Sequence, residues 1–265
     1  MRQGAVGQVR SVVRDGRRLV EKRLSDPARH DNEVRALHAL VGSGLPVPEL
    51  VEEHPGTILM TELPGTRLDD QDPAARREAL RASASLLRGL HEVDPPSGLL
   101  PPPDDVTIIH RYRAADAPPL PLVVPPASGL AFCHGDWTDG NLLSIEGRIT
   151  GIVDWEAAHV GDPVRELSRA AWGAGRKDPL SAEVLIDAYG ADPAEVRAWY
   201  PIHAAELWLW FAEAGPPAYL AELTAELRAW RILGAHRGGD PIARRRWPGY
   251  TGARGKERAN DPSAR

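Results

Sequence analysis

Three oxygen-bearing side chains occur at a defined spacing in the middle of the chain. Asp136 is followed five residues later by Asn141, and Asp154 stands at the end of the hairpin predicted after Asn141. In such a loop–strand–turn–strand unit the three side chains can converge at one end of the hairpin. Asn141 and Asp154 offer oxygen ligands that suit Mg²⁺, and Asp136 can then accept a hydroxyl proton or orient that hydroxyl toward a phosphoryl group. Asp and Asn also form turns, but the joint spacing favours a functional site.

Lysine is scarce in this chain, which makes Lys22 notable. Of the 32 Lys and Arg residues only three are lysines, and Lys22 is the only one among the first 176 residues. Because arginine serves elsewhere as the general surface cation, a specific role for the Lys22 ammonium is indicated. The plain alternative is that Lys22 is one surviving surface lysine.

The pattern of the first 63 residues predicts strand, strand, helix, strand, strand. Asp15-Gly16 predicts a tight hairpin turn, because a type I′ turn needs positive φ at both central residues. Asp31 is the expected N-cap of the helix. A second hairpin is expected to turn at residues 54–56. The predicted strands cover residues 9–13, 18–24, 49–53 and 57–63, and the predicted helix covers residues 31–41.

The rest of the chain has a mainly helical pattern around a few short strands. Asp72 and Pro73 predict an N-cap and a first helical residue, with a helix running to about residue 93. A proline-rich stretch, residues 94–129, is expected to be irregular except near residues 106–112. Short strands are predicted at 131–133, 141–145 and 149–153, and helices over 163–233 with breaks near 175–179, 190–193 and 215–217. The predicted units are residues 1–63, residues 64–235 and a basic, flexible tail of residues 236–265.

Composition and charge exclude several classes of protein. The chain has 265 residues, 42% of them hydrophobic and 26% charged, which excludes a wholly disordered chain. Since the whole chain carries −5 and its last 30 residues carry +5, residues 1–235 carry −10 and do not suit a nucleic-acid binder. The apolar runs are too short for a membrane span, and a single Cys133 excludes an intrachain disulfide. From the N-terminal residues we expect no secretory signal. We therefore expect a monomeric, cytoplasmic protein without nucleic-acid or membrane partners.

Three sequence motifs together resemble those of the aminoglycoside phosphotransferase family, small-molecule relatives of the protein kinases. The similarity extends from about residue 9 to residue 233. It implies an α+β, bilobal, protein-kinase-like fold, with a small β-rich N-terminal lobe, a larger mostly helical C-terminal lobe and a nucleotide between them. The motifs are His134-Gly135-Asp136 through Asn141, Val153-Asp154-Trp155-Glu156, and Gly161-Asp162-Pro163.

The resemblance also implies roles for residues of the nucleotide site. It implies that Lys22 contacts the α- and β-phosphates of ATP or GTP and pairs with Glu33 on the following helix, since a carboxylate fixes an otherwise mobile ammonium. It implies that Asp136 is the catalytic residue and that Asn141 and Asp154 hold Mg²⁺. The residues implied at the adenine site, at the hinge between the lobes, are Met60, Thr61 and Leu63.

Some neighbouring residues have a second, purely structural interpretation. We expect His134 to brace the loop through hydrogen bonds, Asp162 to cap the helix that begins at Pro163, and Cys133 to be a small buried residue. The chain departs from many relatives at Thr138, where they have histidine, and at Glu166, where they have aspartate. Either the first strand of the relatives is missing or the chain starts late, and Gly4-Ala5-Val6-Gly7 is only a weak phosphate-loop pattern.

The acceptor is the least determined part of the hypothesis. Glu206 and Glu213 lie two turns apart on one helical face, and they are candidates for an anionic wall that binds an amino sugar or for a solvated face. Glu156 is expected either to meet a cationic acceptor or to be solvated.

The predicted reaction is transfer of the γ-phosphoryl group of ATP or GTP to a hydroxyl of an aminoglycoside-like antibiotic or a similar cationic small molecule. One alternative is a metabolic or biosynthetic kinase for choline, an amino alcohol, a sugar or a peptide antibiotic. A second alternative is a nucleotide-binding pseudokinase or ligand sensor without turnover.

Overall fold

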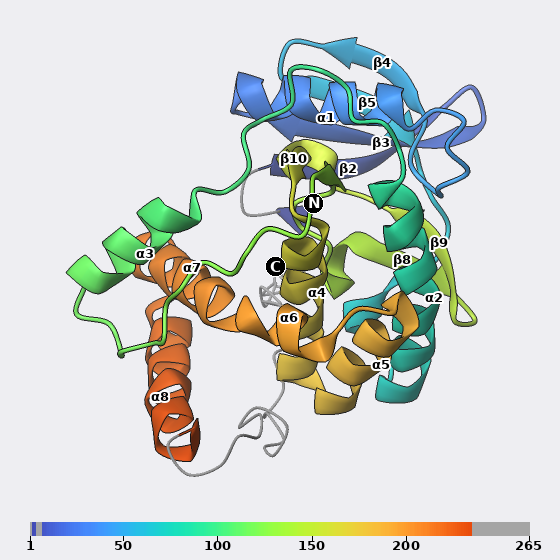
Figure 1. The fold of residues 1–265 in the computed structure, drawn as a ribbon. Helices are drawn as coiled ribbons and strands as arrows, with labels where there is room; N and C mark the ends of the chain where they lie inside the picture. The colour runs from blue at the N-terminus through green and yellow to red at the C-terminus, as the bar shows by residue number, and fades with distance from the viewer. Residues whose placement is uncertain (1, 4–6, 235–265) are drawn as a thin grey trace, which may run out of the picture.

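The computed structural model describes residues 2–3 and 7–234, and it has two parts that differ in secondary structure (Figure 1). The first is an antiparallel sheet of five strands in the order β1-β2-β3-β5-β4, with helix α1 lying beside it. The second is mostly helical and contains two small sheets, one of two strands and one of three. This arrangement confirms the expected α+β class.

The bounds of the elements follow the sequence closely. The five-stranded sheet consists of β1 (Arg2–Gln3), β2 (Gly7–Arg14), β3 (Arg17–Leu24), β4 (Leu50–His54) and β5 (Thr57–Thr61). The small sheets consist of β6 (Thr66–Arg67), β7 (Ala131–Cys133), β8 (Leu142–Ile145), β9 (Arg148–Ile152) and β10 (His159–Gly161). The helices are α1 (Pro27–Ala39), α2 (Pro73–His91), α3 (Asp105–Ala114), α4 (Pro163–Lys177), α5 (Pro179–Tyr189), α6 (Pro193–Ala198), α7 (Tyr200–Glu213) and α8 (Pro217–Gly234).

The hairpin of β2 and β3 forms as its turn residues predict. Asp15 and Gly16 both have positive φ, 52° and 73°, and Arg14 pairs with Arg17 across the turn. The same register pairs Val9 with Lys22. The turn therefore fixes where along β3 the Lys22 side chain leaves the sheet.

The first helix begins earlier than expected. Its N-cap is Asp26, whose side chain accepts the Ala28 N–H at 2.9 Å, and Pro27 is its first residue. The prediction that Asp31 is the N-cap is therefore wrong. Asp26-Pro27 is the same cap-and-proline pair that starts α2 at Asp72-Pro73, and proline at the first helical position loses no hydrogen bond.

The structure corrects four other expectations. A short first strand, β1, is present and pairs antiparallel with β2, so the alternative of a missing first strand is wrong. The proline-rich stretch contains α3, which is capped by Asp104 and longer than residues 106–112. Strand β10 was not predicted, and the break between α6 and α7 was not predicted either. Residues 4–6 of the weak phosphate-loop pattern and the basic tail, residues 236–265, lie outside the described residues.

Buried tryptophans anchor the loops that matter for the site. Trp137 and Trp155 are 1% and 0% exposed and belong to the main hydrophobic core. The Trp155 indole N–H donates to the Ile152 carbonyl at 3.0 Å. Burial of an aromatic side chain stabilises a fold by on the order of 3 kcal/mol, so each indole holds its neighbouring polar residue, Asp136 or Asp154, in a fixed place. None of the described helices is both long and apolar enough to cross a membrane.

Candidate active site

The β8–β9 hairpin brings the three predicted oxygen-bearing residues together. The hairpin turns at Glu146 and Gly147, which have φ of 50° and 76°, and the Val153 N–H donates to the Asn141 carbonyl at 3.0 Å. Asn141 therefore lies opposite Val153, next to Asp154 at the open end. Its side-chain Nδ2 donates to the backbone carbonyl of Asp136 at 3.0 Å and to its Oδ2 at 2.9 Å.

These contacts leave a defined pair of oxygens for a cation. Because Asn141 uses its Nδ2 toward Asp136, its Oδ1 is left without a protein partner among the described residues. Asp154 follows β9 in the left-handed conformation, with φ of 74° and ψ of 62°, and its side chain is 41% exposed. An amide oxygen and a partly exposed carboxylate are hard ligands that fit Mg²⁺.

The loop before Asp136 is tightly packed on the segment after Asp154. Gly135 has φ of +84°, and a Cβ there would lie 2.1 Å from the Ala157 carbonyl oxygen, so only glycine fits. His134 is fully buried, which lowers its pKa and keeps the ring neutral. Its Nε2 donates to the Val153 carbonyl at 3.1 Å, and its Nδ1 accepts the Asp136 N–H at 3.2 Å. The expected bracing role of His134 is confirmed.

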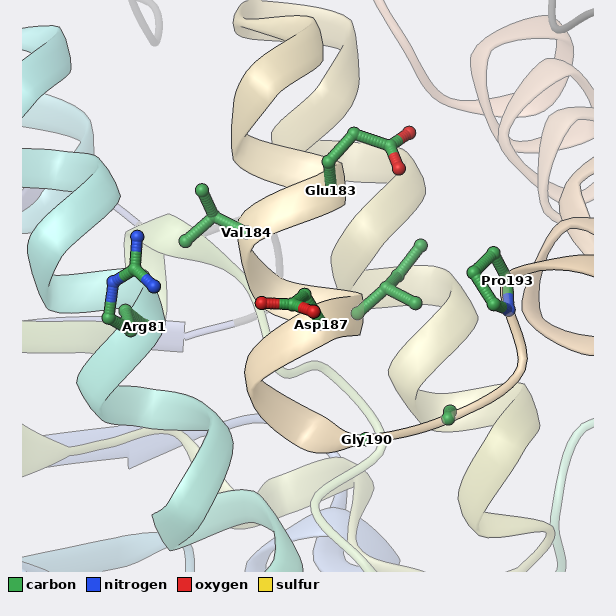
Figure 2. Close-up of a pocket in the computed structure, with 8 residues that line it drawn as sticks. Arg81, Glu183, Val184, Asp187, Gly190 and Pro193 are labelled. Atoms are coloured by element: carbon green, nitrogen blue, oxygen red, sulfur yellow. The ribbon is translucent and has the colours of Figure 1, made fainter.

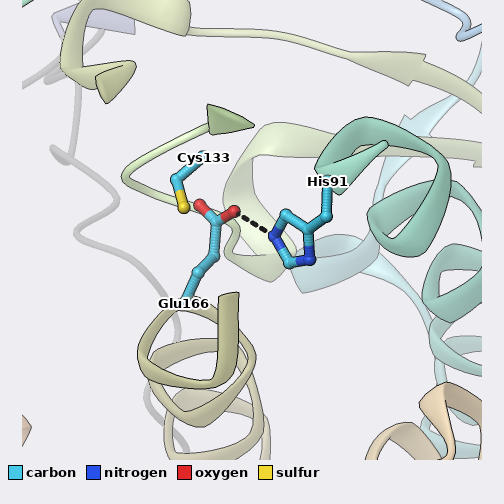
Figure 3. Close-up of side chains that lie close together, drawn as sticks. All are labelled: His91, Cys133 and Glu166. Atoms are coloured by element: carbon cyan, nitrogen blue, oxygen red, sulfur yellow. Dashed lines mark hydrogen bonds and ion pairs between the residues drawn. The ribbon is translucent and has the colours of Figure 1, made fainter. Parts of the chain in front are cut away.

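A second brace comes from helix α4. The Glu166 carboxylate accepts the Gly135 N–H at 2.7 Å and contacts His91 Nε2 at 2.9 Å (Figure 3). Burial acts to raise the pKa of Glu166, but the hydrogen bond and charge of His91 outweigh it and lower the pKa. The contact between His91 and Glu166 was not predicted, because it joins two helices that are far apart in the chain. Cys133 is buried beside the pair, as expected, and burial raises the pKa of its thiol.

Lys22 joins the five-stranded sheet to the catalytic hairpin. Its ammonium lies 2.6 Å from Glu33 Oε2 and 2.5 Å from Asp154 Oδ1, and the residue is only 6% exposed. Burial acts to lower the pKa of Lys22, but the surrounding carboxylates outweigh it and raise the pKa. Burial also raises the pKa of Glu33 to about 7, although the positive charge of Lys22 acts to lower it. The plain alternative, an ordinary surface lysine, is therefore wrong.

Glu156 is a third partner of Lys22. Its Oε2 lies 2.9 Å from the Lys22 ammonium, and its Oε1 accepts from Arg29 at 3.0 Å. The expectation of a solvated Glu156 is wrong, because the residue is buried. Asn32 of α1 fixes this segment by donating to the carbonyls of Glu156 and Ala158 at 3.0 and 2.8 Å. The contacts of Arg29 and Asn32 were not predicted, because they depend on how α1 packs against the segment around Glu156.

The predicted adenine-binding residues follow one another at the end of β5. Met60 is buried with Leu24 and Ile58 in a small cluster under the sheet. The Thr61 N–H donates to the Glu49 carbonyl at 2.9 Å. Leu63, which follows the strand, has no backbone hydrogen bond among the described residues, so its N–H can serve a ligand.

The two carboxylates predicted as an acceptor wall are both paired with arginine. Glu206 Oε2 accepts from Arg169 at 3.2 Å and lies 3.6 Å from Arg165, and Glu213 pairs with Arg111. Arg169 also reaches Asp136 Oδ1 at 3.3 Å. Burial acts to raise the pKa of Glu206, but the His203 contact and the arginines lower it to about 2. Both side chains are therefore ion-pair partners of arginine, and these pairs could not be recognised in the sequence.

A hollow elsewhere on the surface contains none of the predicted site residues (Figure 2). It lies between α2, α5 and the start of α6, and its lining includes Arg81, Glu183 and Asp187. Its charged side chains therefore provide control positions for substitutions in the site.

We expect the stability of the protein to depend on pH because of His203, a buried residue close to Glu206. It is fully buried, and burial lowers its pKa from 6.5 to about 4. Between these values the unfolded chain binds a proton that the folded chain excludes, so stability falls as pH drops from 6.5 to 4. We expect this residue to contribute a loss on the order of 3 kcal/mol.

Urea unfolding of the wild type and of His203→Gln at several pH values between 4 and 7 measures this loss. The pH slope should be smaller in the variant, because glutamine does not titrate. Equal slopes in the two proteins would contradict the assignment.

Comparison with known proteins agrees with this geometry. The phosphotransferase enzyme family matches residues 3–121 and 101–199 of the chain. Similar solved structures include macrolide 2'-phosphotransferase MphH from Brachybacterium faecium, with a TM-score of 0.61 and 20% identity over 84% of this chain and 89% of that chain. A choline/ethanolamine kinase family protein from Mesorhizobium loti has a TM-score of 0.60 and 19% identity over 85% of this chain and 88% of that chain.

A third structure contains ligands. A thermostable mutant of aminoglycoside phosphotransferase APH(4)-Ia, in ternary complex with AMP-PNP and hygromycin B, has a TM-score of 0.64 and 17% identity over 89% of this chain and 94% of that chain. At these identities the structures show the fold, which confirms the bilobal, protein-kinase-like arrangement. No curated protein matches the chain at a significant level. The family match covers well over half of the sequence, so the chain belongs to the phosphotransferase enzyme family, whose members include the aminoglycoside phosphotransferases.

Proposed function

We propose that this protein transfers the γ-phosphoryl group of ATP or GTP to a hydroxyl of a small molecule. The observation that carries the proposal is the ion pair between Lys22 and Asp154, which joins the sheet to the hairpin that follows the Asp136 loop. A triphosphate bound between the two parts would have an ammonium and Mg²⁺ ligands on the same side. Positioning and charge neutralisation supply most of the catalysis in phosphoryl transfer.

In the proposed reaction the acceptor hydroxyl oxygen attacks the γ-phosphorus. The bond between that phosphorus and the β–γ bridging oxygen breaks, the nucleoside diphosphate leaves, and Asp136 takes the hydroxyl proton. Asn141 contributes by donating a hydrogen bond to Asp136 Oδ2, which fixes the direction in which the carboxylate points. Asp136 is 37% exposed, so a substrate can reach it.

The remaining roles concern the nucleotide. Lys22 would orient the phosphates, with Glu33 holding the ammonium from behind. Asn141 Oδ1 and Asp154 would hold Mg²⁺, which when bound neutralises phosphate charge. The partner-free Leu63 N–H would donate to the base, next to Thr61 and the buried Met60. Glu156 is proposed as a second anchor of Lys22, in place of a direct contact with the acceptor.

The mass of the product tests the proposal. The full chain is incubated with Mg·ATP or Mg·GTP and a panel of hydroxyl acceptors that includes aminoglycosides, choline, amino alcohols and sugars. An acceptor that gains the mass of one phosphoryl group establishes the reaction, and comparison of the two nucleotides gives the preference. If Mg-nucleotide raises the melting temperature but no acceptor on the panel is modified, the ligand-sensor alternative is favoured.

A further inference from the structure

The guanidinium of Arg169 bridges two carboxylates, that of the proposed catalytic residue Asp136 and that of Glu206 on α7. Arg169 Nη2 lies 3.3 Å from Asp136 Oδ1, and Arg169 Nη1 lies 3.2 Å from Glu206 Oε2. The Arg169 side chain is 29% exposed, and both of its partners are also partly exposed. The bridge therefore lies at the surface that an acceptor must approach to reach Asp136.

A further arginine closes the ion-pair network on the far side of Glu206. Arg165 lies 3.6 Å from Glu206 Oε2 and binds Asp105 of α3 through its Nε and Nη2, at 3.0 and 2.6 Å. Glu206 thus has two guanidinium partners, and its negative charge is compensated within the protein. Because arginine presents donors in a rigid planar fork, these pairs hold a defined geometry.

The negative charge of Glu213, at the outer end of the same face of α7, is also neutralised by an arginine. Glu206, Trp210 and Glu213 share one face of α7, since they are spaced by four and three residues. Glu213 pairs with Arg111 of α3, the helix packed beside α7 (Figure 1). Between the two ion pairs the Trp210 side chain is 44% exposed. This face offers an acceptor an aromatic surface between neutralised carboxylates.

We propose that Arg169 determines the charge of the acceptor by occupying the position at which an ammonium group would bind. A polycation could reach Asp136 and Glu206 only by displacing an arginine that the chain keeps in place. The acceptor is therefore a neutral or singly charged hydroxylated molecule with an apolar face for Trp210, and not a polyamine. This inference rests on the proposed function and narrows its substrate class.

The test measures binding of the polycation gentamicin to the full chain by calorimetry, without any turnover. Replacement of Arg169 by methionine removes the bridging charge and leaves Asp136 and Glu206 open to an ammonium. We expect Arg169→Met to bind gentamicin at least about tenfold more tightly than the wild type, a difference of about 1.4 kcal/mol. The gain should shrink at high salt, because the contacts are partly exposed.

Two control variants separate the local effect from net charge and from misfolding. Arg81→Met removes one positive charge from the surface hollow of Figure 2, away from Asp136 and Glu206, and it should bind gentamicin as the wild type does. Arg169→Lys keeps the charge and should also match the wild type. Melting temperatures show whether each variant is folded.

The proposal is overturned if wild type, Arg169→Met and Arg81→Met bind gentamicin equally, if none of the three binds it, or if the wild type binds it most tightly. These outcomes are independent of the proposed reaction. Should no acceptor be phosphorylated while Arg169→Met alone gains affinity, the proposed function fails and the charge assignment at this surface stands.

Discussion

The Asp136→Asn variant is expected to fold and to bind nucleotide as the wild type does, but to lose phosphoryl transfer by about 10²–10⁴-fold. An amide in this position keeps the size of the side chain, and its single oxygen can still accept from either Asn141 or Arg169, which donate to the carboxylate at 2.9 and 3.3 Å. It cannot take the proton of the acceptor hydroxyl. The rate of product formation with Mg·ATP at saturating acceptor measures the loss.

The matched control is Asp187→Asn, on α5 in the surface hollow of Figure 2. It makes the same chemical change at an exposed position outside the site, and its turnover should equal that of the wild type. Binding of Mg·AMP-PNP, followed by thermal shift, should be the same in both variants. A folded Asp136→Asn protein with wild-type turnover would remove Asp136 from the catalytic role.

The sequence predicted those parts of the site that a single local unit creates. Asp136, Asn141 and Asp154 lie within one loop and one hairpin, so their spacing and the turn at Glu146 and Gly147 were enough to bring them together. Asp162 was predicted as a helix cap for the same reason, and it accepts the N–H groups of Val164 and Arg165 at 2.8 and 3.1 Å. The pairing of Lys22 with Glu33 came from the family resemblance.

The charge pairing of the site could not be predicted, because it arises between elements far apart in the chain. Arg169 meets Asp136 across 33 residues, and His91 meets Glu166 across 75. In each case the side chain looked like an ordinary residue of an amphipathic helix. Identical arginines on solvated faces give the same pattern, so sequence periodicity cannot tell a surface charge from one that neutralises a site.

This pairing also changes what the acidic composition of the chain means. The excess of carboxylates in residues 1–235 is compatible with a cationic acceptor, but Glu156, Glu206 and Glu213 each contact a lysine or arginine. Net charge therefore overstates the negative potential that a ligand meets. The partners of a carboxylate, and not the number of carboxylates, determine which cation a pocket can bind.

Removal of the Lys22 charge should affect stability as well as activity. In Lys22→Met, the carboxylates of Glu33, Asp154 and Glu156 lose their common cation while Glu33 and Glu156 stay buried. Loss of one partner of a buried ion pair costs about 3–5 kcal/mol. We expect the free energy of unfolding in urea to fall by about this amount at neutral pH, and transfer from Mg·ATP to be lost because the phosphates have no ammonium. An unchanged stability would contradict the buried network.

The double variant Lys22→Met/Glu33→Gln separates the two losses. Glutamine replaces the most deeply buried of the three carboxyl groups with a side chain that cannot ionise and can still form hydrogen bonds, so the double variant should be more stable than Lys22→Met alone. The coupling between the two substitutions should lie in the range of about 0.5–3 kcal/mol found for residues in contact. Transfer activity should not return, because glutamine restores no positive charge. Additive losses of stability would show that Glu33 does not hold Lys22, and recovered activity would show that the ammonium is not needed for the phosphates.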